Sequence, residues 1–337
     1  MFSFESFLDL PLIWGGLIAT AVLLYVLLDG FDLGIGILFP FAPSEKCRDR
    51  LMNSVAPFWD GNETWLVLGG GGLFAAFPLA YAIVMPALYV PVIIMLLCLI
   101  FRGVAFEFRF KADKSRFIWD NAFHFGSLGA AFSQGLILGG FVQGIEIDGR
   151  AFAGGAFDWL TGFSVMTGLA VTAGYVLLGA TWAIMKTDGD TQAWARKTAR
   201  YILVYVAFFM AIVCLWVPFL DNDIGERWFG TYFYWLLPLP ILTMVLFALL
   251  IRALVRNHET SPFLYSIGLF FLGYLGLGAS LWPRVVPHDV TIWQAAAAPE
   301  SLSLLLVGTV IMLPVVLGYT AWCYYVFRGK AGHEHLY

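Results

Sequence analysis

The chain has 337 residues, of which 60% are hydrophobic, 17% aromatic and only 12% charged, with a formal net charge of −4. A soluble domain carries about 25% charged residues, so this composition excludes an ordinary soluble globular protein, and the weak charge gives no sign of nucleic-acid binding. Several uncharged stretches of about 20 residues are long enough to cross a bilayer. The sequence therefore predicts an all-α polytopic membrane protein.

Nine apolar segments are predicted to span the membrane as helices, because no strand-like alternation competes and helices satisfy their own backbone groups in lipid. In chain order they cover 11–39, 57–78, 80–101, 119–142, 160–185, 201–219, 232–251, 263–281 and 302–327. The first is too long for one straight crossing, and Gly30, Gly34 and Gly36 are expected to let it bend or loosen near its end. No basic region precedes it, so we expect it to be retained rather than cleaved.

Basic residues are distributed unevenly between the two sides of the membrane. Sixteen of the 19 lysines and arginines fall in the odd-numbered loops and the carboxy-terminal tail. The even-numbered loops hold only Arg150, Arg227 and Arg284. Because cytoplasmic loops carry the excess of Lys and Arg, the amino terminus is predicted outside and the carboxy terminus in the cytoplasm. An odd number of spans agrees with this orientation.

A short motif indicates an internal repeat. Tyr25-Val-Leu-Leu in the first span recurs as Tyr175-Val-Leu-Leu in the fifth, 150 residues later. Both spans are predicted to run in the same direction, so a duplicated four-helix unit with one extra helix would fit. A chance match of four residues is the alternative.

Acidic residues gather in or beside the first two spans. Asp29 and Asp32 lie in the first span, and Asp60 and Glu63 lie in the stretch WDGNETW (59–65) at the start of the second. A charged residue at the centre of a membrane helix costs roughly 2.5–3.5 kcal/mol on insertion scales, so four of them are not incidental if they are buried. Because one cytoplasmic loop joins the two spans, we expect all four at a similar depth.

Asp120 enters the fourth span, and Arg102 closes the third, on the same side of the membrane as these acids. One interpretation is local, with Asp60 and Glu63 capping a helix at the interface. The other is a hydrated acidic entry for protons, since neighbouring carboxylates can share a proton near neutral pH. Two carboxylates holding a hard cation would give the same pattern, and Asp29 with Asp120 is the candidate pair.

Ligands for a haem or a metal are scarce. His124 is the only histidine within a predicted span, whereas a haem held by two histidines needs a second imidazole at the same depth. The four cysteines are scattered and form no CxxC or CxxCH motif. The glycines at 69–72 lack the lysine of a phosphate loop, and close helix packing explains them. We therefore predict no catalytic residue, cofactor ligand or metal ligand in this chain.

Four segments carry a resemblance to a known family. They are LLDGFDLGIGILFPF (27–41), APFWDGNETWLVLGGGGLFAAFP (56–78), FRGVAFEFR (101–109) and GYVLLGATW (174–182). In this order they resemble subunit II of the cytochrome bd-type ubiquinol oxidases, including the cyanide-insensitive branch. A generic transporter is not expected to share DGFDLG and WDGNETW at this spacing.

The resemblance implies an oxidoreductase that acts only as a complex. Subunit II of this family pairs with a homologous subunit I, which holds two b-type haems, one d-type (or substituting b-type) haem and the quinol loop. The complex lies in the bacterial inner membrane, oxidises quinol, reduces oxygen to water and takes the protons from the cytoplasm. The roles implied for this chain are to stabilise subunit I and to line a proton path. Small single-span subunits and a structural quinone are further partners to consider.

The family architecture is two four-helix bundles with one peripheral helix. It implies a first bundle over 1–142, a second over 143–281, and a ninth helix with a cytoplasmic tail over 282–337. This division agrees with the duplicated unit that the repeated motif indicates.

The site residues follow from the resemblance and the acidic pattern together. Asp60 is predicted to be the cytoplasmic mouth of a proton path, and Asp29 a deeper relay or, with Asp120, a cation site. Glu63 is a candidate relay, and Arg102 a candidate for balancing charge. The competing class is an ion-coupled secondary transporter that uses the same buried acids. A structural scaffold whose acids are satisfied locally is the third.

Overall fold

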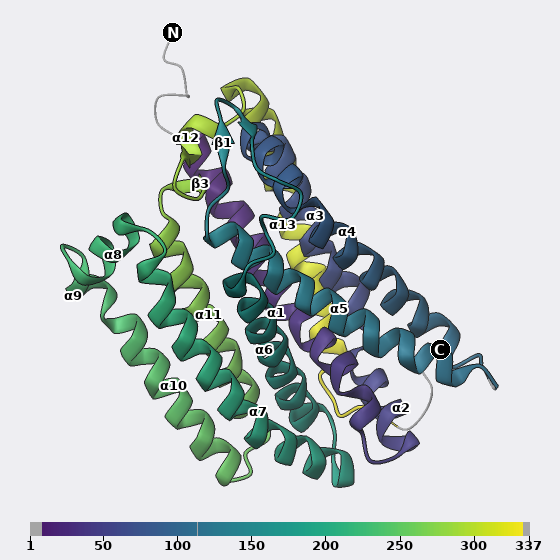
Figure 1. Ribbon diagram of the computed structural model, residues 1–337. Helices are drawn as coiled ribbons and strands as arrows, with labels where there is room; N and C mark the ends of the chain where they lie inside the picture. The colour runs from purple at the N-terminus through teal and green to yellow at the C-terminus, as the bar shows by residue number, and fades with distance from the viewer. Residues whose placement is uncertain (1–8, 113, 333–337) are drawn as a thin grey trace.

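The computed structural model describes residues 9–112 and 114–332, which form a bundle of long helices with short elements at its ends (Figure 1). The long helices are α1 (Leu10–Leu38), α3 (Trp59–Ala76), α4 (Pro78–Arg109), α5 (Arg116–Val142), α6 (Gly162–Lys186), α7 (Gly189–Trp216), α10 (Pro238–Val255), α11 (Ser261–Leu281) and α13 (Pro299–Val326). The short helices are η2 (Phe39–Phe41), α2 (Glu45–Val55), η3 (Val217–Phe219), α8 (Asn222–Phe229), α9 (Phe233–Leu236) and α12 (Ile292–Ala295).

Eight helices among the described residues are long and apolar enough to cross a membrane, which confirms the prediction of an all-α, multi-span protein. The other long helix is α3, whose 18 residues include Asp60, Asn62, Glu63 and four consecutive glycines. These residues lower its mean hydropathy, although α3 packs against α1 like a spanning helix. The count of nine spans therefore remains a prediction.

Two predicted spans are too short. The third was expected to end at residue 101, but α4 continues to Arg109, and the sixth was expected to begin at 201, but α7 begins at Gly189. In both extensions one helix face is buried, with Phe106 and Arg109 in α4 and Ala195 in α7 packed inside the protein. A search for uncharged stretches misses such ends, because they contain charged residues, such as Arg102 and Arg109 in α4 and Arg196 in α7.

The first span does not loosen at its glycines, so that expectation is wrong. Helix α1 stays α-helical to Leu38 and buries every residue from Asp29 onward. A Cβ at Gly34 would lie 1.8 Å from the carbonyl oxygen of Tyr175, and one at Gly179 would lie 2.5 Å from the carbonyl carbon of Gly34. These glycines therefore allow the backbones of α1 and α6 to cross in contact.

Two small hairpins are exceptions to the all-α prediction. β1 (Ile147–Asp148) pairs with β2 (Ala151–Phe152), and β3 (Arg284–Val286) pairs with β4 (Val290–Thr291), both antiparallel. Gly149 turns the first hairpin with a φ of +63°, a conformation that glycine adopts without steric cost. Strands this short give no alternation that a sequence could show.

The main core joins helices from both halves of the chain. Phe31 of α1 stacks on Trp182 of α6 with ring centroids 4.0 Å apart, and Phe263 of α11 meets Trp182 edge-on at 5.1 Å. The indole N–H of Trp182 also donates to the carbonyl oxygen of Ser54 in α2, at 3.2 Å. This packing fixes α1 against α6 and so determines where Asp29 and Asp32 lie.

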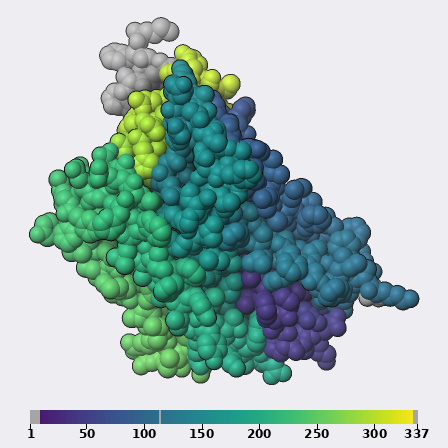
Figure 2. Space-filling view, in the orientation of Figure 1, coloured from purple at the N-terminus to yellow at the C-terminus, as the bar shows by residue number. Residues whose placement is uncertain are grey.

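We call the lower end of the bundle in Figure 1 the basic end, because the segments that carry 16 of the 19 lysines and arginines meet there. It comprises α2, the α4–α5, α6–α7 and α10–α11 connections with the helix ends that adjoin them, and the segment after α13. The space-filling view shows the purple α2 region at the lower edge, beside teal and green helices from later in the chain (Figure 2). The opposite end carries the hairpins and α12.

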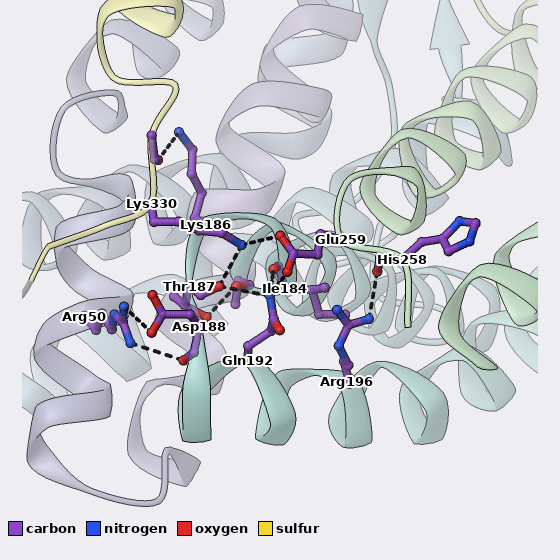
Figure 3. A network of polar contacts seen from close by, with 12 residues as sticks. Arg50, Ile184, Lys186, Thr187, Asp188, Gln192, Arg196, His258, Glu259 and Lys330 are labelled. Atoms are coloured by element: carbon purple, nitrogen blue, oxygen red, sulfur yellow. Dashed lines mark hydrogen bonds and ion pairs between the residues drawn. The ribbon is translucent and has the colours of Figure 1, made fainter. Parts of the chain in front are cut away.

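The segment after α13 is tied to the basic end by polar contacts (Figure 3). The buried Lys186 closes α6, and its ammonium donates to the carbonyl oxygens of Phe327 and, at 3.2 Å, Gly329. The backbone N–H of Ala331 donates to Lys186 O at 2.7 Å, and Arg50 of α2 donates to Ala331 O at 3.2 Å. One lysine thus caps the end of α13, where carbonyl groups lack helical partners.

A second lysine holds the same segment from outside. Lys330 donates to the carbonyl oxygen of Thr187 at 2.9 Å and pairs with Glu259, of the α10–α11 connection, at 2.8 Å. Hydrogen bonding to Lys330 keeps the pKa of Glu259 below its ordinary value of 4.5. The contribution of this pair is therefore fully present above pH 4.5 and is lost as the pH falls through the lowered pKa.

Replacing Lys186 with methionine is expected to release this segment. Methionine keeps much of the side-chain volume but donates no hydrogen bond, and bonds to a charged group contribute about 1.5–3 kcal/mol. The fraction of molecules in which the segment after α13 is detached should rise on the order of 10- to 100-fold. Trypsin cleavage after Arg328 and Lys330 should rise with it. Mass spectrometry of the released peptides measures this. The matched control is the exposed Lys197→Met, and equal cleavage in both variants would contradict the capping role.

Candidate functional site

A single buried arginine collects three acidic side chains in the described part of the chain. Arg102 of α4 is 0% exposed, and its Nη1 lies 2.9 Å from Oδ1 of Asp29 and 2.7 Å from Oε1 of Glu63. Its Nη2 lies 3.9 Å from Oδ2 of Asp32. Asp29 and Asp32 are also fully buried, whereas the side chain of Glu63 is 25% exposed. We call these four residues the Arg102 cluster.

Helix geometry explains why these residues meet. Asp29 and Asp32 are three residues apart on α1 and so share one face. Glu63 lies one turn into α3, which runs back along α1 after the short α2. At Gly126 of α5 a Cβ would lie 2.9 Å from the backbone nitrogen of Arg102, so this glycine lets α5 pack directly behind the arginine. The guanidinium reaches the acids of α1 and α3.

Asn62 and Tyr324 complete the cluster, and sequence reasoning missed both. The amide of Asn62 donates to Oδ2 of Asp32 at 2.7 Å and to the carbonyl oxygen of Leu28 at 3.2 Å. Its Oδ1 accepts from the Tyr324 hydroxyl at 3.1 Å. Asn62 could have been identified from the sequence, because it lies between the predicted site residues Asp60 and Glu63. Tyr324 comes from α13, 262 residues away, and carries no such signal.

The acids become more buried with distance from the start of α3. Asp60, in its first turn, is exposed, Glu63 is partly exposed, and Asp29 is fully buried. Asp60 and Glu63 are one helical turn apart, and Glu63 and Asp29 share the same guanidinium nitrogen. The predicted residues Asp60, Glu63, Asp29 and Arg102 thus lie in order from the exposed first turn of α3 to the buried interior.

The structure does not bring Asp29 and Asp120 together. Asp120 pairs with the buried Arg109 at 2.5 Å, in a second cluster where Arg109 also lies 2.7 Å from Asp49. Arg102 and Arg109 are seven residues apart on α4, or about 10 Å along the helix. Each acid therefore has its own arginine, which supplies the positive charge that a shared cation would bring. No group of three His, Cys, Asp or Glu residues suited to a metal occurs among the described residues.

An apolar groove lies between α1, α3 and α13, away from the Arg102 cluster. Trp14 and Leu24 of α1, Trp65 of α3 and Leu313 of α13 line it. Trp65 is 2% exposed, and its indole N–H has no hydrogen-bond partner among the described residues. The groove thus combines apolar walls with one buried donor.

The fold and the site define a helical membrane protein with a buried, acid-rich charge cluster. Comparison with known proteins gives its family. The model of cytochrome bd terminal oxidase subunit II matches residues 10–327, nearly the whole chain. The chain therefore belongs to the cytochrome bd terminal oxidase subunit II family, which confirms the resemblance found in the four sequence segments.

Individual relatives agree along their full length. The chain is 31% identical over 342 residues to the cytochrome bd ubiquinol oxidase subunit 2 of Bacillus subtilis (strain 168), covering 96% of this chain and 97% of that protein. It is 28% identical over 365 residues to the cytochrome bd-I ubiquinol oxidase subunit 2 of Escherichia coli (strain K12), covering 97% and 96%. The solved bd oxidase of Geobacillus thermodenitrificans has the same fold, with a TM-score of 0.78, 16% identity, and 95% and 99% coverage.

Proposed function

We propose that this chain is the haem-free subunit of a quinol oxidase and conducts protons from the cytoplasm toward a haem-bearing subunit I. Both relatives named above are subunit 2 of a ubiquinol oxidase, which implies a subunit I as partner. The observation that carries the proton role is the Arg102 cluster, in which three carboxyl groups share one guanidinium. An excess of acids over bases in a dry interior binds protons, which belong to the cluster as a whole.

The orientation is part of the proposal. Nine spans, with α3 as the second, would place the amino terminus outside and the basic end in the cytoplasm of a bacterial inner membrane. The concentration of lysines and arginines at that end supports it. We also propose the division into bundles over 1–142 and 143–281 with a peripheral helix and tail over 282–337.

In this orientation Asp60 is the mouth of the path. A proton entering at Asp60 passes to Glu63, one turn further into α3, and then through intervening water to Asp29, which contacts the same guanidinium nitrogen. Arg102 stays charged and does not itself carry the proton. Arg102 keeps the carboxylates close together, because without its charge they would repel one another. Asp32, fixed by Asn62, adds acceptor capacity at the inner end.

Replacing Asp60 with asparagine is expected to slow quinol-dependent oxygen uptake roughly tenfold, while the reduced-minus-oxidised haem spectrum of the complex stays normal. The loss is smaller than the 10²-fold or more typical of an essential internal proton-transfer group, because water can reach Glu63 directly. An oxygen electrode measures the rate in purified complex. The control is Asp148→Asn, an exposed acid at the opposite end. Normal turnover in Asp60→Asn would remove it from the path.

The redox cofactors are proposed to belong to the partner. We infer from the family resemblance that subunit I holds two b-type haems and one d-type or substituting b-type haem. The described helices of this chain offer only His124 within a span, 3.4 Å from the carbonyl oxygen of Gly36. A structural quinone is proposed to lie along the apolar groove at Trp65. Small single-span subunits would bind to the lipid-facing helices. The transporter alternative expects a broken helix at Gly30–Gly34, and α1 is continuous there.

A further inference from the structure

Three side chains form a hydrogen-bonded row beside Asp29 that the proton path does not use. Gln134 of α5 lies between Tyr25 of α1 and Tyr175 of α6. Its Nε2 donates to the Tyr25 hydroxyl at 2.7 Å, and its Oε1 accepts from the Tyr175 hydroxyl at 2.7 Å. Both tyrosines are buried, at 4% and 1% exposure. They are also the two tyrosines of the repeated Tyr-Val-Leu-Leu motif, which the fold brings to one glutamine.

The row leads to Asp29. Tyr25 is one helical turn before Asp29 on α1, so the two buried side chains lie on the same face of the helix. The Asp29 oxygens accept no hydrogen bond of good geometry from the described residues apart from their ion pair with Arg102. Acceptor sites therefore remain on the carboxylate for a donor such as the Tyr25 hydroxyl.

The amide determines the direction in which Tyr25 can bond. Since Gln134 donates to the Tyr25 oxygen, the Tyr25 hydrogen is free to point at Asp29. Turning the amide by 180° exchanges its donor and acceptor ends. Tyr25 would then donate to Gln134 and could only accept from Asp29, which requires Asp29 to be the protonated acid. Tyr175 can hydrogen-bond to Gln134 in either amide orientation, because a hydroxyl both donates and accepts.

We propose that Gln134 is a positioning residue for Asp29, holding Tyr25 as a donor to the Asp29 carboxylate in one amide orientation and as an acceptor from the Asp29 acid in the other. This inference rests on the proposed function, since it matters only if Asp29 gains and loses protons. The row can hydrogen-bond both the carboxylate and the acid form of Asp29. Asp29 can therefore gain and lose a proton without leaving a buried polar group unpaired, which is costly. Tyr175 supplies the partner for the far end of the amide in both states.

The test compares variants in the purified whole complex. Tyr25→Phe and Gln134→Leu are each expected to lower oxygen turnover about tenfold, the effect of losing a hydrogen bond to a charged group. Infrared difference spectroscopy gives a second readout. The carboxylic C=O band that disappears in Asp29→Asn should shift in both variants, because Tyr25→Phe removes the acceptor of the acid's O–H and Gln134→Leu no longer holds that acceptor in place. The matched control is Tyr274→Phe, which removes a hydroxyl that donates to Ala19 O at 2.7 Å on another helix.

A double variant separates positioning from packing. Tyr25→Phe combined with Gln134→Leu should turn over no more slowly than Tyr25→Phe alone, since both act through one contact on Asp29. Additive losses with an unmoved infrared band would overturn the proposal. If Gln134→Leu fails to assemble, Gln134→Met serves instead, because it keeps much of the side-chain length but has neither the amide donor nor the amide acceptor, and the Asp29 band should shift in the same way.

The inference and the proposed function fail differently. Slow turnover in Asp29→Asn with normal turnover and an unmoved band in Gln134→Leu would overturn the positioning role alone. Normal turnover in Asp29→Asn would overturn the proton path, and the positioning role with it.

Discussion

Replacing Arg102 with methionine is expected to abolish assembly of the complex or to lower its thermal midpoint severely. The change leaves Asp29 and Asp32, both 0% exposed, without the charge that they share. Removing one partner of a buried ion pair costs about 3–5 kcal/mol, because the remaining charge is buried uncompensated. The yield of haem-containing complex and its thermal midpoint measure the effect. Arg252→Met, at the exposed end of α10, is the control.

A compensating variant tests the cause. Arg102→Met combined with Asp29→Asn and Asp32→Asn removes the charges together and should recover much of the assembly, because neutral side chains carry a far smaller burial cost. Oxygen turnover should stay low, since the proton-binding groups are gone. Wild-type yield in the single Arg102→Met variant would show that the acids are neutral or solvated and do not depend on the arginine.

Asparagine at position 29 is expected to lower oxygen turnover on the order of 10²-fold without changing the haem spectrum. Asparagine has nearly the shape of aspartate and still offers an oxygen to Arg102, so packing is preserved. It cannot bind or release a proton. Quinol-dependent oxygen uptake of the purified complex measures the loss.

Asp120→Asn is the control that distinguishes a proton path from a cation site. Asp120 contacts Arg109 rather than Arg102, so the proton path predicts nearly normal turnover for this variant. A shared cation site instead predicts that Asp29→Asn and Asp120→Asn lose turnover alike and that sodium ions alter both. The two hypotheses thus give opposite results for one substitution.

Residue types and spacing in the chain were sufficient to predict much of the fold. Long uncharged stretches predicted the membrane helices, because lipid admits few other structures, and four motifs predicted the family. The predicted span edges were wrong at α4 and α7, where the helices continue inside the protein through residues that include charged side chains. The two hairpins are too short to leave a pattern.

The candidate site was predicted only in part. Spacing on α1 and α3 predicted Asp29, Asp32, Asp60 and Glu63 at one depth, since one short connection joins the two helices. Three of them meet at Arg102, whereas Asp60 is exposed in the first turn of α3. The spacing did not predict that Asp29 and Asp120 lie in different clusters. Asp29 pairs with Arg102 and Asp120 pairs with Arg109, and these two arginines are seven residues apart on α4.

The sequence by itself determined that this is a membrane protein, its family, and which acids are expensive to bury, because composition and local spacing govern insertion and helix formation. Only the tertiary structure decided which charges neutralise one another and that Asn62, Tyr324 and Gln134 join them. Those contacts depend on the angle and register at which helices pack, and the glycine crossing of α1 and α6 sets that register through backbone contact. Residues 262 positions apart, such as Asn62 and Tyr324, meet only once the bundle has closed.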